Sequence, residues 1–245
     1  MIGTHTDTPP RPSPARPDAA GRFLAAVRVV AEKDLTIELR TREIVTTAGF
    51  FAILVALMTS ISFYSSALTS KYFAPGTVWL SVAFSSILAL GRTWQRERED
   101  GALTGLLVTP APRASIFLGK AIGVFVFVSV VEVLVVPVVA LVFHVDVQPM
   151  LGPLALLLAL GTIGVSAMGT LFGAMTVRTR ARDLVLATVL FPLLSPMLLS
   201  GVAATRELFG GARLADVSDY VLLLAVFDVV AVAGGIGLFG ALVDD

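Results

Sequence analysis

The sequence contains no cysteine, which excludes disulfide bonds, thiolate metal sites and cysteine catalysis for this chain. It has only two histidines, His5 and His144, and their spacing cannot form an HExxH-type metal site. Charged residues make up 15% of the 245 residues, compared with about 25% in soluble proteins. These shortages give little support to an enzyme function and point away from a soluble domain.

A phosphate-binding loop is also missing. The Gly-Lys pair of this chain is Gly119-Lys120. A phosphate loop requires a glycine five residues before that Gly and a Ser or Thr after the Lys, but Ala114 and Ala121 occupy those positions. We therefore expect the chain to have no ATP site of its own.

The N-terminal tail, residues 1–21, is rich in Pro, Thr and Ala and has no apolar stretch. Such a composition cannot bury a core, and it predicts disorder. The tail also lacks the apolar region of a signal peptide, and the first long apolar run begins only near Ile44.

Six long apolar runs follow, in a chain with a mean hydropathy of +0.88. About 20 apolar residues cross a bilayer as a helix. The runs predict an all-α membrane protein with one membrane domain over 44–243, whose spans cover about 44–66, 72–91, 121–143, 150–177, 184–205 and 220–243.

The Lys and Arg residues alternate between the two sides of these predicted spans. The N-terminal segment, loop two (92–120) and loop four carry 15 of them, whereas the other connections carry 3. Cytoplasmic loops are enriched in Lys and Arg. We therefore expect a bacterial inner-membrane protein with both termini in the cytoplasm.

The segment 22–43 before the first span has amphipathic spacing, with Leu24, Val27, Ala31, Leu35 and Leu39 recurring every three or four residues. This cytoplasmic segment either lies in the membrane interface with its cations near anionic headgroups, or packs on the bundle as an ordinary helix. We favour the interfacial position because the segment directly precedes the first span.

Loop two is the longest polar connection between spans. Its pattern predicts a short amphipathic helix, with acids at its start and leucines on one face. The residues concerned are Glu97, Glu99, Asp100, Gly101, Leu103, Leu106 and Leu107. The helix either rests on the membrane beside a solvated loop or is a docking surface for a cytoplasmic partner.

Two acids interrupt the apolar runs, Glu132 in the third span and Asp228 in the sixth. A charge at the bilayer centre is costly, and such residues usually face protein or water and mark a functional site. Each is a candidate for a role in transport. The alternative is a protonated acid that only bonds a neighbouring helix or lies near the interface.

His144 ends the third span beside Asp146. It is a weak candidate for ligating a metal or haem iron, because an imidazole can ligate but no second ligand is evident in the sequence. A local hydrogen bond is the simpler role for this side chain.

Small residues and prolines indicate where helices pack closely or bend. Small residues four positions apart permit close packing of membrane helices, and prolines break helical hydrogen bonds. The candidates for packing and kinks are Pro75, Gly76, Gly169, Gly173, Pro192 and Pro196.

Several short stretches, in this order, resemble the haem exporter protein B family, the permeases of the cytochrome c maturation ABC transporter. The resemblance covers about residues 23–243. The stretches that carry it are 33–40, 74–76 with Trp79, 88–92, 99–103, 106–107, 118–120, 160–164 and 191–196. Thr104 departs from the family pattern, where we expect an acid, and so does the Pro-rich tail.

The resemblance implies a six-helix permease that pairs with a second copy of itself. It implies that a separate cytoplasmic ATPase carries the ATP and docks on the loop-two helix, the coupling helix. It further implies other haem-handling membrane subunits, a periplasmic haem chaperone and haem as possible cargo. No nucleic-acid partner is expected. The alternatives are a permease of this fold for another cargo, such as a drug or polysaccharide, and an ion-driven secondary transporter.

Overall fold

The computed structural model describes residues 19–63, 67–99, 105, 109, 111–176 and 182–244. Its seven α-helices in these ranges include six that are long and apolar enough to cross a membrane, which confirms the predicted all-α membrane fold. The helices are α1 (Ala19–Thr41), α2 (Glu43–Phe63), α3 (Ala67–Glu99), α5 (Arg113–Phe143), α6 (Leu151–Thr176), α7 (Arg182–Phe209) and α8 (Ser218–Asp244), with a short 3-10 turn η1 (Gln148–Met150) before α6.

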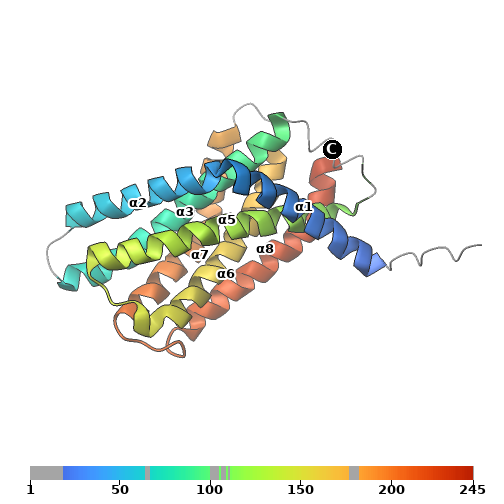
Figure 1. Ribbon diagram of the computed structural model, residues 1–245. Helices are drawn as coiled ribbons and strands as arrows, with labels where there is room; N and C mark the ends of the chain where they lie inside the picture. The colour runs from blue at the N-terminus through green and yellow to red at the C-terminus, as the bar shows by residue number, and fades with distance from the viewer. Residues whose placement is uncertain are drawn as a thin grey trace, which may run out of the picture.

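The six long helices run alongside one another as a bundle, and α1 packs mainly on α5 at one end of it (Figure 1). We call this end, where α3 ends and α5 begins, the α3–α5 end; the opposite end, where α5 ends and α6 begins, is the α5–α6 end. The C-terminus lies toward the α3–α5 end, as does α1. Because an even number of spans separates α1 from the C-terminus, the two lie at the same end of the bundle.

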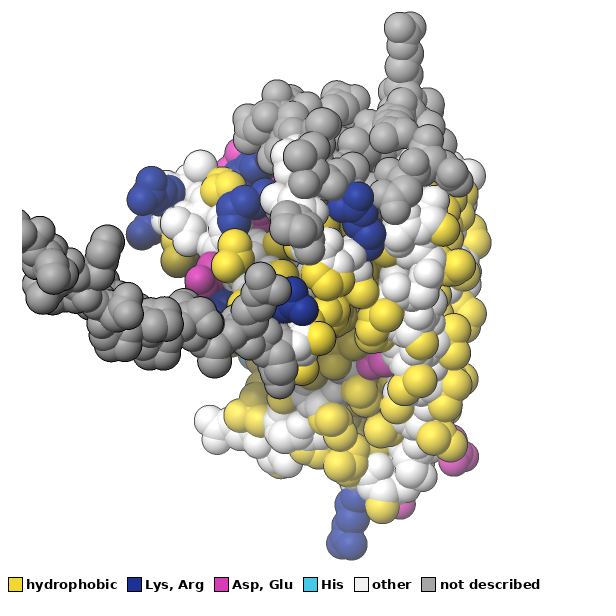
Figure 2. All heavy atoms as spheres, turned by 90° about the vertical axis from the view of Figure 1, so that its right-hand side faces the viewer, with side chains coloured by type: hydrophobic (Ala, Val, Ile, Leu, Met, Phe, Trp, Pro, Cys, Tyr) yellow, Lys and Arg dark blue, Asp and Glu magenta, His cyan; other side chains and the backbone are white. Residues whose placement is uncertain are grey.

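The surface separates charged from apolar side chains. On the face shown in Figure 2, many of the Lys and Arg side chains lie in the upper half of the view, and hydrophobic side chains cover the flank below them. Large apolar residues such as Leu141, Leu199 and Val229 are well exposed on the bundle. An apolar flank of this kind suits a hydrocarbon environment rather than water.

Both helices that border loop two are longer than the apolar runs. The α3 helix continues through Arg92 and Arg96 to Glu99, and α5 already begins at Arg113. Parts of the predicted loop two, 92–120, are therefore helical continuations of α3 and α5. In these extensions Arg92, Arg96, Glu97 and Lys120 pair with charged side chains of other helices, so these four charges do not need an aqueous loop.

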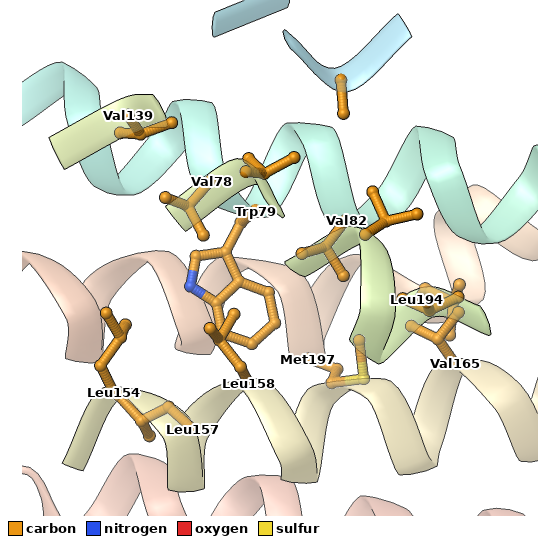
Figure 3. Close-up of a cluster of buried hydrophobic side chains, with 14 of the residues drawn as sticks. Val78, Trp79, Val82, Val139, Leu154, Leu157, Leu158, Val165, Leu194 and Met197 are labelled. Carbon is orange, nitrogen blue, oxygen red and sulfur yellow. The ribbon is translucent and has the colours of Figure 1, made fainter. Parts of the chain in front are cut away.

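Trp79 of α3 occupies the centre of the bundle, where it is 1% exposed (Figure 3). Its ring lies directly against Gly161 of α6 and Gly201 of α7, where a Cβ atom would overlap the ring. Its indole Nε1–H donates a 2.9 Å hydrogen bond to Thr205 Oγ1. Three helices are thus joined around one aromatic side chain whose polar atom is satisfied.

The prolines of α7 do not interrupt the helix, which contains both Pro192 and Pro196. Pro196 has no N–H, so the carbonyl of Pro192 loses its usual helical donor. The Ser195 hydroxyl donates to that carbonyl oxygen at 2.7 Å. A local side chain therefore replaces the missing backbone bond, as membrane helices require. Pro75 also lies inside a helix, α3, and Gly76 follows it.

The paired glycines of α5 and α6 lie at close helix contacts. Gly169 and Gly173 face Leu90 and Trp94 of α3. On α5, a Cβ on Gly119 would lie 2.6 Å from Cβ of Val30 in α1, and Gly123 faces Asp34. These four-residue spacings bring α3 onto α6 and α1 onto α5.

Candidate functional site

A largely buried group of charges joins α1, α3 and α5 at the α3–α5 end. We call Lys33, Asp34, Glu97 and Lys120 the α1 ion cluster. The ammonium of Lys120, 1% exposed, donates to Asp34 Oδ2 at 2.8 Å and to Glu97 Oε1 at 2.5 Å. Lys33 also pairs with Glu97. Two cations and two carboxylates thus share one site contributed by three helices.

The charges of this cluster compensate one another. Buried charges are tolerated when they are paired and hydrogen-bonded. Burial lowers the pKa of Lys33, but its hydrogen bond to Glu97 and the charges of Asp34 and Glu97 leave that pKa above the ordinary value. The Lys120 ammonium also lies 5.8 Å from the ring centroid of Trp94, a cation–π contact. The cluster is therefore an electrostatically neutral joint.

A second ion pair network fixes the junction of α1 and α2. Arg96 of α3 contacts Glu38 of α1 at 3.3 Å and Glu43 of α2 at 2.9 Å. The second oxygen of Glu38 accepts a 2.9 Å hydrogen bond from the N–H of Val45 in the first turn of α2. Helix N-termini have unpaired N–H groups that a carboxylate can satisfy. The end of α1 is thereby attached to both α2 and α3.

These contacts change the position predicted for Glu97. It lies in α3 and is 3% exposed, so it is part of the α1 ion cluster rather than of an exposed loop helix. Glu99 is the last residue of α3. The remaining residues of the predicted coupling helix lie outside the described residues: Asp100, Gly101, Leu103, Leu106 and Leu107.

The two acids inside the spans pack against the same turn of α6. The Thr162 hydroxyl donates a hydrogen bond to Glu132 Oε1 of α5. Two residues further on, Gly164 faces Asp228 of α8, whose Oδ1 would lie 2.7 Å from a Cβ on that glycine. Together with Gly161 beneath Trp79, this turn contacts α3, α5 and α8. The stretch 160–164, which carries part of the family resemblance, is thus a packing centre of the bundle.

Both acids lie deep within the spans. Glu132 is 11 residues before the end of α5, and Asp228 is 10 residues after the start of α8, both counted from the α5–α6 end. At about 1.5 Å per residue, each is roughly 15 to 17 Å from that end, near the middle of a hydrocarbon core of about 30 Å. We call Glu132 and Asp228 the midplane acids.

The midplane acids differ from the α1 ion cluster because no described cation pairs with either one. Glu132 and Asp228 are 7% and 6% exposed. Glu132 has the Thr162 hydroxyl as a donor, whereas no described side chain donates a hydrogen bond to Asp228. Acids in this environment are stable only when protonated or when another group supplies a donor.

His144 ends α5 in a left-handed conformation, with φ of 54°. The next residue, Val145, donates its N–H to the Ala140 carbonyl at 2.9 Å, which closes the helix end. The His144 side chain is exposed at the α5–α6 end. Within the described residues, no group of three or more His, Cys, Asp or Glu side chains is placed to hold a metal ion.

Sequence patterns did not identify Asp34 and Lys120 as site residues, although both lie in stretches that carry the family resemblance. A signal was present for Asp34. With Val27, Ala31 and Glu38 it falls on one helical stripe, and all four side chains are buried. Two acids on the buried stripe of an amphipathic helix call for a cation on the facing helix. The sequence does not show that this cation is Lys120.

Comparison with known proteins gives consistent matches. The sequence profile of the family described as "CcmB protein" matches residues 25–240. A protein of Pseudomonas aeruginosa named "Heme exporter protein B" is 30% identical over 172 residues, which cover 70% of this chain and 76% of that protein. The protein of the same name from Paracoccus denitrificans is 31% identical over 165 residues, 67% of this chain and 74% of its own length.

Proposed function

Since the chain belongs to the CcmB protein family, we propose that it is the permease subunit of a haem-export ABC transporter that acts in cytochrome c maturation. The observation that carries this proposal is the family match over residues 25–240, which spans α1 and all six membrane helices. Relatives named "Heme exporter protein B" support haem as the substance exported. A permease for another cargo and an ion-driven transporter are the competing functions.

ATP hydrolysis takes place on a partner chain in this proposal, because the sequence has no phosphate loop around Gly119-Lys120. The segment 100–112 between α3 and α5 would receive the ATPase through Leu103, Leu106 and Leu107. Leucine side chains on one helix face fit a hydrophobic groove of a partner. Membrane subunits that handle haem, a second copy of this chain and a periplasmic haem chaperone complete the assembly that we infer.

The α1 ion cluster supports a mechanical role for this segment. Glu97 lies three residues before Asp100, and Lys120 lies in the second turn of α5. A force applied to the segment would act on both residues, since Lys120 pairs with Asp34 of α1 and Glu97 pairs with Lys33 of α1. Motion of the ATPase would thus reach α1, α3 and α5 together.

In this proposal the α3–α5 end faces the cytoplasm and the α5–α6 end faces the periplasm of the inner membrane, an orientation that the distribution of Lys and Arg supports. Reporter fusions at Asp100 and Arg180 should then report the cytoplasm, and fusions at Asp146 and Arg213 the periplasm. A cytoplasmic signal at Asp146 would contradict this orientation.

Recovery of the ATPase tests the proposal directly. The Leu106→Asp, Leu107→Asp variant should insert normally but lose the ATPase during affinity purification from bacterial membranes, because buried leucines each contribute about 1.5 to 3 kcal/mol. Leu214→Asp, a partly exposed leucine at the α5–α6 end, is the matched control and should retain it. Normal ATPase recovery with the double variant would rule out this docking site. If wild-type protein recovers no ATPase, the permease function itself is wrong.

A further inference from the structure

A groove of about 380 Å³ lies between α5 and α6 on the outside of the bundle. One wall is formed by α5 residues from Ser129 to Pro137, and the other by α6 residues from Leu151 to Ala159. The groove is hollow because small side chains, Ser129, Ala155 and Ala159, face it. Small residues spaced four apart, as Ala155 and Ala159 are, allow another helix to approach closely.

The polar atoms of this groove are mainly hydrogen-bond acceptors. Glu132 is part of the lining, and Thr162 satisfies one of its two carboxyl oxygens. Val133 and Pro137 also line the groove. Because Pro137 lacks an N–H, the carbonyl of Val133, four residues earlier, has lost its usual hydrogen-bond donor in the helix. The lining contains no Lys, Arg or His. An occupant that brings a hydrogen-bond donor would satisfy these acceptors, which an acyl chain cannot do.

The depth of Glu132 narrows the choice of occupant. Cations of the described spans lie near helix ends: Lys71, Arg92, Arg96, Arg113, Lys120 and Arg206. A second copy of this chain would therefore bring no described cation to the level of Glu132. Asp228, by contrast, lies against Gly164, which also faces Phe227 and Met197.

We propose that the α5–α6 groove binds a transmembrane helix of a different membrane subunit, which places a Lys, Arg or His side chain against Glu132. This inference rests on the proposed function, since it requires a partner membrane subunit. The partner helix supplies apolar surface to the walls and a cation to the acid. Paired intramembrane charges of this kind hold membrane subunits together.

Photo-crosslinking in native membranes tests the assignment on the whole complex. A benzophenone amino acid at Val133, 72% exposed beside Glu132, is compared with the same probe at Val229 of α8, which is 68% exposed at a similar depth. The Val133 probe should crosslink a transmembrane peptide of another chain that has Lys, Arg or His within one helical turn. The Val229 probe should give roughly tenfold less of this product. Adducts with lipid only, with a second copy of this chain, or with a helix that has no such cation would overturn the proposal.

A groove-filling variant provides an independent measurement. Ala155→Trp should lower recovery of the crosslinked partner roughly tenfold, whereas Val229→Trp should leave it unchanged. Because Ala155 is exposed, the substitution does not disturb the core of this chain. Recovery of the ATPase is measured in the same samples and should stay normal in both variants. Unchanged partner recovery with Ala155→Trp would refute the groove as the binding site of the partner helix and would leave the proposed function standing. Loss of the ATPase from wild-type samples would refute the proposed function.

Discussion

The α1 ion cluster and the midplane acids both contain buried ionisable side chains, but these side chains are compensated in different ways. In the cluster, Lys33 and Lys120 face Asp34 and Glu97, so each charge has an opposite partner from another helix. In the membrane interior, Glu132 has only a threonine hydroxyl, and Asp228 packs against a glycine. Among the described residues, every charge of the first arrangement has an opposite partner, whereas no cation faces either acid of the second.

This difference separates structural charges from candidate functional ones. A buried pair is neutral as a unit, and removing one partner leaves the other uncompensated. An acid without a cation can remain neutral by protonation, and it then tolerates substitution by an uncharged group of the same shape. The two regions should therefore respond in opposite ways to the same chemical change, the removal of one charge.

The largest effect is expected for Lys120→Met, because this substitution leaves Asp34 and Glu97 buried with a single remaining cation. The free energy of unfolding should fall by about 3 to 5 kcal/mol. The measurement is thermal unfolding of the purified protein in detergent, together with the amount of folded protein in membranes. The double variant Asp34→Asn, Lys120→Met keeps Glu97 paired with Lys33 and should recover most of the loss. A double variant no more stable than the single one would contradict the pairing.

An intermediate effect is expected for Glu132→Gln. The amide oxygen still accepts the hydrogen bond from Thr162, so unfolding should change by less than about 1 kcal/mol. Transport activity should fall, because the variant removes the charge that the groove offers to a partner. The measurements are the same thermal unfolding and an assay of cytochrome c maturation in cells. Full activity of Glu132→Leu would show that this acid has no role in transport.

The smallest effect is expected for Arg28→Ala. Arg28 pairs with Glu32 one turn away on α1 at 2.6 Å, but both side chains are largely exposed. Exposed pairs contribute little because water and salt screen them. The melting temperature should not change measurably, whereas Lys33→Met on the same helix should lower it. Equal losses for the two variants would mean that burial does not distinguish these ion pairs.

Much of the fold was predictable because membrane insertion depends on local properties of the sequence. Six apolar runs and the alternation of Lys and Arg predicted six spans, and the structure has six helices of the required length. The helices α3 and α5 extend beyond the predicted apolar runs. A search for charge-free windows ends at the first charge, such as Arg92 or Lys120, whereas a helix continues when its charged side chains find partners.

The midplane acids were also visible in the sequence, because a charge inside an apolar run is conspicuous by itself. Their surroundings were not visible. That Glu132 meets Thr162 and borders a groove, while Asp228 meets Gly164, depends on how α5 and α8 pack on opposite sides of one turn of α6.

The sequence by itself determined the class of this protein, because hydropathy, charge alternation and helical period are read over stretches of about 20 residues. The tertiary structure alone decided which charges neutralise one another. Lys120 and Asp34 are 86 positions apart, and their pairing requires α1 to lie on α5 at the Gly119 and Gly123 contacts. Electrostatic attraction in a buried site depends on separations of a few ångströms, and only the packing of the helices sets those separations.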